Sequence, residues 1–302
     1  MHQPLPRRSF LAASAGLAAS AVLADEETPP APTPRGYKKA VKYYMVQPGQ
    51  DAKEKFTLVK ELGFDGIELD APNNFKLADV LEARKKTGLE IPGVVDSVHW
   101  NDTHQLGSPD ASSRARGVEA LKGALRTARD YGATTVLLVP ANVTKKVTYA
   151  DAYKRSQEEI RKVLPLCKEL GVRIALENVW NNFSPSPLEL EGYVDEFESD
   201  QIGVHFDVGN IVLYGWPEQW VRVLGKRIIK LDIKEFSRSR CDREGRYKGF
   251  DVPLLKGDCD WPAVMKALRE VGYTGWGTAE IAPGDEKYLA GVARDMNTIF
   301  GY

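Results

Sequence analysis

Short apolar, β-branched runs alternate with longer amphipathic segments along most of the chain, and this alternation limits the folds open to it. Glycine follows several amphipathic segments, as in ELG 61–63 and DYG 130–132, at the position where helices commonly end. The predicted strands are 40–46, 65–69, 91–95, 134–139, 172–177, 202–207, 227–234 and 275–280. The predicted helices are 51–62, 76–87, 112–131, 149–170, 261–271 and 285–300.

Eight strands alternating with helices over about 250 residues predict an α/β fold of the (β/α)8 type, a TIM barrel formed by one domain. An open, doubly wound sheet is the competing architecture. That architecture explains eight strands less naturally, and the chain lacks a G-x-G-x-x-G motif after its first strand. We therefore expect residues 37–302 to form a single closed barrel.

Residues 1–24 have the features of an export signal. Arg7 and Arg8 precede an apolar stretch, 10–24, that is shorter than the roughly 20 residues needed to span a bilayer. The pattern resembles a bacterial twin-arginine signal cleaved after residue 24, with an uncleaved anchor as the alternative. The proline-rich segment 25–36 is expected to be an extended linker. The expected location is periplasmic or extracellular, without stable membrane insertion after cleavage.

The net charge bears on which molecules the chain binds, and the cysteine spacing bears on disulfide pairing. The formal net charge is −1, so no strong field attracts the chain to nucleic acid or to anionic lipid. The cysteines at 167, 241 and 259 lack C-x-x-C spacing. Cys241 and Cys259 flank a polar loop and would pair only in an oxidising compartment, and nothing in the sequence requires that they do.

Acidic residues stand at the ends of the last four predicted strands. They are Glu177, Asp207, Asp232 and Glu280. A (β/α)8 barrel builds its active site at the carboxyl ends of its strands, so the four side chains are expected to meet there. One such acid alone would more often cap a helix or turn. Four on neighbouring strands are the basis for predicting a site.

The two-residue period of a strand predicts which of these side chains face the barrel interior. His205 shares a face with Asp207, and Lys230 and Lys234 share a face with Asp232. Clustered inward carboxylates repel one another and lose hydration unless a cation neutralises them. One divalent metal ion is the simplest neutraliser. Oxygen ligands favour Mn²⁺ or Mg²⁺, with Co²⁺ or Zn²⁺ as alternatives.

Six stretches in chain order resemble motifs of the xylose isomerase-like barrels. This superfamily includes sugar and sugar-phosphate isomerases and epimerases and the endonuclease IV group. The motifs are loose individually and do not specify a substrate. They are LGFDGIEL (62–69), ALENVWN (175–181), FDVGN (206–210), DIKEF (232–236), GDCDWPAVMKAL (257–268) and YTGWGTAE (273–280).

The resemblance to the ketose epimerases of this superfamily implies a ligand set for the metal. A Glu, an Asp, a His and a Glu on strands five to eight hold one divalent ion in those enzymes. Carried over, the ligands are Glu177, Asp207, Asp232 and Glu280. The strand-seven position departs from the pattern because aspartate stands where the family has histidine. The site is therefore expected to be more anionic.

The same resemblance implies substrate contacts near those ligands. Arg238 stands six residues after Asp232, where the epimerases also have arginine. Asn210 takes the place of a histidine contact, and Phe183 replaces a second glutamate. Surface charge is the alternative role for Arg238.

The resemblance also implies a chemistry. A small carbohydrate would lose a proton next to its carbonyl, giving an enediolate, and regain the proton on the opposite face or on the neighbouring carbon. Glu177 and Glu280 are the predicted catalytic pair. A carboxylate bound to the metal is a weaker base, so at least one of them must leave the metal or bind it through one oxygen.

Other polar and aromatic residues near the strand ends are candidate substrate contacts. His99 and Trp100 follow the third strand, where an aromatic ring can stack on a sugar. Glu68 ends the second strand, and pairing with Lys42 or an arginine is its alternative. His205 is a substrate contact, a residue that orients Asp207, or a hydrogen-bonded histidine of the barrel interior. Lys234 is a further candidate, and Trp180 and Trp216 are candidates for the cavity wall.

Three other functions compete. A lyase, hydratase or hydrolase of keto-glycosides would use the same metal site and the same proton abstraction. A non-catalytic carbohydrate-binding barrel with a decayed site agrees with Asp232 and Phe183. An endonuclease IV-like phosphodiesterase needs several histidines, whereas only His99, His104 and His205 follow the leader. The sequence leaves the oligomeric state open, a homo-oligomer included.

Overall fold

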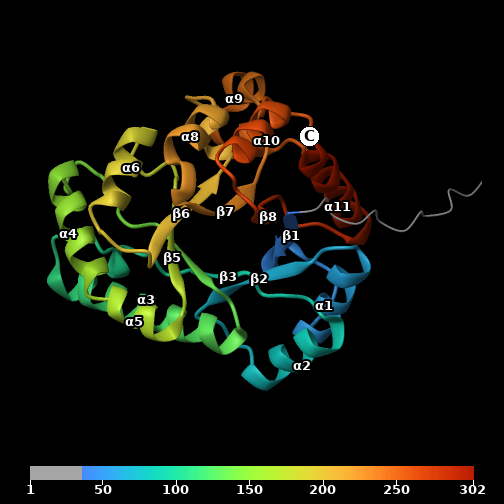
Figure 1. Ribbon diagram of the computed structural model, residues 1–302, viewed down its shortest axis with the longest axis horizontal. Helices are drawn as coiled ribbons and strands as arrows, with labels where there is room; N and C mark the ends of the chain where they lie inside the picture. Colours follow the sequence, from blue (N-terminus) through green and yellow to red (C-terminus); the bar gives the residue numbers. More distant parts are fainter. Residues whose placement is uncertain (1–35) are drawn as a thin grey trace, which may run out of the picture.

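The computed structural model describes residues 36–302. The predicted export signal and all but the last residue of the predicted linker lie outside these described residues. Eight parallel strands pair in chain order and close into a barrel, with β1 beside β8 (Figure 1). The predicted single-domain (β/α)8 fold is confirmed. The strands are β1 (Tyr37–Lys42), β2 (Gly66–Ala71), β3 (Gly93–Asp96), β4 (Thr135–Leu138), β5 (Arg173–Glu177), β6 (Ile202–Asp207), β7 (Ile228–Ile233) and β8 (Gly275–Ala279).

Helices surround the barrel and cover the outer faces of its strands (Figure 1). No helix among residues 36–302 is long and apolar enough to cross a membrane. The main helices are α1 (Ala52–Glu61), α2 (Leu77–Thr87), α3 (Ala111–Tyr131), α4 (Tyr149–Arg161), α5 (Leu164–Leu170), α6 (Pro187–Asp195), α8 (Pro217–Leu224), α9 (Arg238–Glu244), α10 (Trp261–Glu270) and α11 (Glu286–Gly301).

Some element boundaries differ from the sequence prediction. The predicted helix 149–170 is two helices, because Pro165 in the first turn of α5 has no amide hydrogen to continue the pattern of α4. The first strand ends at Lys42, and a 3-10 turn occupies 43–45. Helices α6, α8 and α9 were not predicted, because each is short. Ser186 caps the N-terminus of α6 and Ser237 that of α9, and α8 begins at Pro217.

Charged groups fill the middle of the barrel. Lys230 on β7 bonds Glu68 on β2, and both side chains are about 1% exposed. Since β2 and β7 are not neighbours, the contact crosses the interior. On β3, a Cβ at Gly93 would lie 2.6 Å from the Lys230 Nζ and 2.8 Å from a Glu68 oxygen, so a larger residue there would separate the pair. The neighbouring Leu231 belongs to the outer hydrophobic core.

This buried pair gives a prediction for stability. Lys230→Met is expected to lower the free energy of unfolding by about 3–5 kcal/mol, because it leaves the buried Glu68 carboxylate without a partner. Glu68→Met/Lys230→Met removes both charges and should recover most of the loss. Urea denaturation of the three proteins measures the effect. A single variant within about 1 kcal/mol of the parent would show that Glu68 is already neutral.

Candidate metal centre and active site

Four carboxylates from consecutive strands meet at one end of the barrel. Glu177 and Asp207 are the last residues of β5 and β6, Asp232 lies one residue before the end of β7, and Glu280 follows β8. One ligand oxygen from each lies within 4.8 Å of the others. The predicted clustering is therefore present, and the metal-binding role of the cluster stays a prediction.

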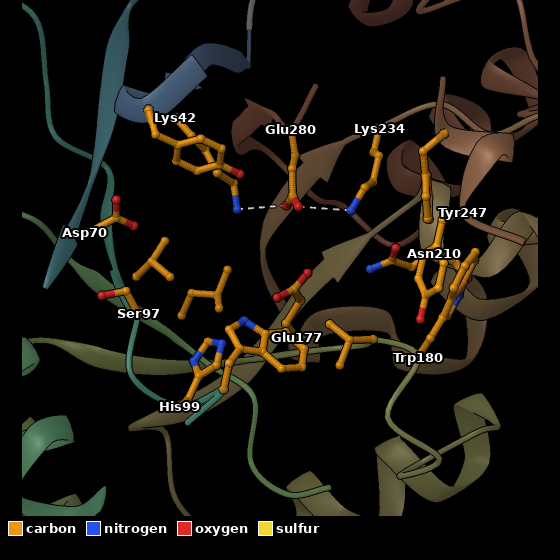
Figure 2. A pocket seen from close by; sticks show the side chains of 16 residues that line it. Lys42, Asp70, Ser97, His99, Glu177, Trp180, Asn210, Lys234, Tyr247 and Glu280 are labelled. Atoms are coloured by element: carbon orange, nitrogen blue, oxygen red, sulfur yellow. Dashed lines mark hydrogen bonds and ion pairs between the residues drawn. The ribbon is translucent and has the colours of Figure 1, made fainter. Parts of the chain in front are cut away.

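Two lysines bind the same carboxylates. Lys42 Nζ lies 2.8 Å from Asp232 Oδ2 and 2.9 Å from Glu280 Oε2. Lys234 Nζ lies 3.1 Å from Asp207 Oδ2 and 3.0 Å from Glu280 Oε1. Figure 2 shows Glu280 between the two ammonium groups. Lys42 was considered from the sequence only as a partner of Glu68. A lysine at an inward position of a buried strand was the available signal.

The donor set fits a divalent ion of the hard, oxygen-preferring kind. The four carboxylates face two ammonium groups, so two negative charges are left over. The buried oxygens Asp232 Oδ1 and Glu280 Oε2 also lack a hydrogen bond. They approach His205 Nε2 and Lys42 Nζ at 2.9 Å without hydrogen-bond geometry. A cation such as Mn²⁺ or Mg²⁺ would satisfy both the charge and these oxygens.

The protonation of the cluster reflects the same shortage of positive charge. Burial and the neighbouring carboxylates raise the pKa values of Glu177 and Asp232 well above their usual range. Burial raises the pKa of Asp207 to about 7. Burial also acts on Glu280, but Lys42 and Lys234 outweigh it and hold the Glu280 pKa well below its usual range. Without a cation, the cluster therefore retains protons that solvated carboxyl groups would lose.

Two of the four carboxylates, Glu177 and Glu280, line a cavity of about 530 Å³. Five further residues that the sequence analysis predicted also line it. They are His99, Trp100, Asn210, Lys234 and Trp180. Figure 2 shows Asp70, Ser97 and His99 on one side of the cavity and Trp180, Asn210 and Tyr247 on the other.

Three predicted substrate contacts do not line the cavity. Glu68 lies deeper in the barrel and is bonded to Lys230. His205 is fully buried beside Asp232, and burial lowers its pKa well below the usual value, so it is neutral. Arg238 donates to the carbonyls of Val212 (2.7 Å) and Gly215 (2.9 Å) and so secures the segment after β6.

Two asparagines hold the site in place: Asn178, which lies outside the predicted set, and the predicted residue Asn210. Asn178 Nδ2 donates to the carbonyl of Asp207, whose amide donates back to Asn178 Oδ1. Asn210 donates its amide hydrogen to Asp207 Oδ1 at 2.9 Å and its side-chain amide to the Asn178 carbonyl. The polar residues directly after β5 and β6 in ENVWN and DVGN were the sequence signal.

Glu235 organises the long segment between β7 and α10. Its buried carboxylate accepts hydrogen bonds from the amides of Leu255 and Cys259 and from the Trp261 indole. This segment carries Tyr247 and Phe250 to the cavity. All three cysteines are free thiols in this arrangement.

The fold and the carboxylate cluster place the protein among the (β/α)8 barrels that have a candidate divalent-metal centre at the strand ends. The particular family follows from direct comparison. The family model described as xylose isomerase-like TIM barrel matches residues 56–295, and the chain belongs to that family.

Several proteins that are similar to this chain are named as sugar epimerases. The chain is 24% identical over 235 residues to L-ribulose-5-phosphate 3-epimerases from Escherichia coli O1:K1 and Salmonella heidelberg, covering 74% of this chain and 79% of theirs. Among solved structures, 3-keto-D-glucoside 4-epimerase from E. coli has a TM-score of 0.73 at 17% identity, covering 88% of this chain and 100% of that one. D-psicose 3-epimerase from Clostridium cellulolyticum H10 has a TM-score of 0.71 at 20% identity, covering 88% and 98%. These structures show the shared fold.

The raised carboxyl pKa values predict how the metal-free protein responds to pH. Asp207 and the buried Asp96 titrate near pH 7 when folded but near pH 4 when unfolded, so the folded form holds more protons between these values. Their stabilising contribution is complete at low pH and is lost as pH rises through about 7. From about pH 6.5, where most unfolded histidines are already neutral, to about pH 8 the melting temperature should fall, and above about pH 8 these two residues should cause little further change.

Thermal melts of EDTA-treated protein across this range measure the effect. Added Mn²⁺ should raise the melting temperature more at about pH 8 than at about pH 6, because the metal replaces protons. A melting temperature of the metal-free protein that rises across the range would contradict the assignment.

Proposed function

We propose that the protein is a metal-dependent sugar isomerase or epimerase that moves a proton next to a carbonyl. The convergence of Glu177, Asp207, Asp232 and Glu280, with Glu177 and Glu280 lining the adjoining cavity, carries this proposal. The names of the similar proteins, which are sugar epimerases, support it.

A bound divalent ion would supply Lewis-acid polarisation of the substrate carbonyl and the neighbouring hydroxyl. The four carboxylates would hold it. Glu177 and Glu280 come from β5 and the end of β8 and both line the cavity. One removes the proton from the carbon next to the carbonyl, giving an enediolate, and the other returns a proton. Their roles exchange in the reverse reaction.

Lys42 and Lys234 assist from either side of Glu280. Their ammonium groups lie 2.9 and 3.0 Å from its two oxygens and line the same cavity. They keep Glu280 ionised and oriented, and they favour negative charge that develops on substrate oxygens.

Deuterium exchange tests the proposal. Protein loaded with Mn²⁺ is incubated in D₂O with a panel of ketoses and keto-glycosides, and deuterium next to the carbonyl is followed by NMR and mass spectrometry. We expect incorporation that EDTA abolishes and Mn²⁺ restores. Metal-loaded protein that binds a sugar but exchanges no proton would favour a non-catalytic barrel.

Elimination or hydrolysis of a keto-glycoside is a second candidate, supported by the exposed aromatic residues Trp100 and Tyr247 that line the cavity and suit a second ring. It begins with the same proton abstraction but releases the group attached through the glycosidic oxygen. Product analysis in the same incubations separates the two. Release of that group indicates elimination or hydrolysis, and its retention indicates epimerisation or isomerisation.

A further inference from the structure

Resting on the proposed function, we propose that the substrate is an uncharged keto-sugar linked to a second ring, a keto-glycoside, and not a phosphorylated ketose. The keto-sugar lies over the carboxylates, and the second ring lies between two aromatic walls of the cavity. The similar curated epimerases are named for a phosphorylated substrate, so this assignment separates the chain from them.

Aromatic side chains from distant parts of the chain form the two walls. Trp180, after β5, stands 5.6 Å from Tyr247 and 4.8 Å from Phe250 between ring centroids, and all three line the cavity. Tyr44 and Trp100, after β1 and β3, line it from other strands. Figure 2 shows Trp180 and Tyr247 across the cavity from His99.

The exposure of these rings points to a ligand. Tyr247 is 70% exposed, Trp100 53% and Tyr44 48%. Large aromatic rings left in water forgo the stabilisation of burial, and their apolar faces match the C–H faces of sugar rings. The cavity of about 530 Å³ is within the range of about 300–1,000 Å³ that holds ligands of drug size. It therefore has room for more than one ring.

No lysine or arginine among the described residues that line the cavity is free to bind a phosphate. Phosphate sites use available Lys or Arg side chains or helix N-termini. Among the described residues that line the cavity, the two lysines, Lys42 and Lys234, are both bound to carboxylates. Arg238, which is bound to backbone carbonyls, and Arg246, which lies 4.6 Å over the ring of Trp180, do not line the cavity.

His99 supplies a neutral donor suited to a hydroxyl group. Its Nδ1 accepts from the Val139 amide at 3.3 Å, so the proton is on Nε2. That Nε2 is buried without a hydrogen-bond partner, although His99 lines the cavity and is only 4% exposed. Burial lowers the His99 pKa to about 3, so the ring carries no charge. A buried donor without a partner is costly unless a ligand accepts its hydrogen bond.

The test compares three substrates with Mn²⁺-loaded protein: a free ketohexose, a 3-keto-glucoside with an aromatic or sugar aglycone, and a ketose 5-phosphate. Deuterium exchange gives kcat/KM, and titration calorimetry gives the binding constant. We expect the keto-glycoside to have at least about tenfold higher kcat/KM than either ketose. Trp180→Ala and Tyr247→Ala should each raise its KM about three- to tenfold, the size of one aromatic contact.

Trp216→Ala is the matched control, because Trp216 is 56% exposed but does not line the cavity. This substitution should change neither the KM nor the kcat/KM of the keto-glycoside. Fastest exchange with the ketose phosphate, unaffected by Trp180→Ala, overturns the substrate assignment and leaves the proposed function standing. Tight binding of the keto-glycoside without exchange or bond cleavage supports the substrate assignment and overturns the proposed catalysis. Failure of the metal-loaded protein to bind any keto-glycoside overturns the assignment.

Discussion

Glu177→Gln in the Mn²⁺-saturated protein is expected to lower deuterium exchange about 10²- to 10⁴-fold, the usual contribution of a positioned acid or base. Glutamine preserves the size of the side chain and the cavity that it lines. It removes both the transferable proton and the negative charge. Glu280→Gln should have a similar effect for the same reason.

Metal binding must be separated from proton transfer in these variants, because both residues belong to the carboxylate cluster. Exchange is therefore measured over a Mn²⁺ titration up to saturation, with bound metal counted by elemental analysis. Glu189→Gln, on the exposed side of α6, is the matched control and should behave as the parent protein does. Full exchange by a metal-saturated Glu177→Gln variant would remove Glu177 from the proton-transfer pair.

Lys42→Met is expected to have the second large effect. Lys42 is 4% exposed, and burial is outweighed by Asp232 and Glu280, which hold its pKa well above the usual value. Its loss leaves the buried Asp232 without a lysine partner and Glu280 with Lys234 alone, so the metal-free protein should lose about 3–5 kcal/mol of unfolding free energy. Affinity for Mn²⁺ should rise at least about tenfold, because a competing positive charge within hydrogen-bond distance is gone.

The double variant Lys42→Met/Asp232→His tests the cause. It removes one positive and one negative charge, so two unbalanced negative charges remain, as in the parent protein. Metal-free stability and Mn²⁺ affinity should both return toward parental values. Chemical denaturation and isothermal titration calorimetry measure the two quantities. If Lys42→Met instead weakens Mn²⁺ binding, Lys42 orders the ligands more than it competes with the metal.

The strand-end acids show what local patterns predict well. Glu177, Asp207, Asp232 and Glu280 follow runs whose β character is plain in the sequence, and parallel barrel strands all end at the same rim. Their convergence therefore follows from the fold. The same reasoning misplaced Arg238 relative to the cavity, because a loop side chain has no strand period to fix its direction.

The sequence by itself determined the closed barrel and the end of it at which four acids gather, because periodicity and strand order are local properties. Only the tertiary structure decided which cations meet those acids and which rings wall the cavity. Lys42 is 190 residues from Asp232, and Glu68 is 162 from Lys230. Closure of the barrel places such residues face to face across its interior, and that proximity leaves no periodic signal in the chain.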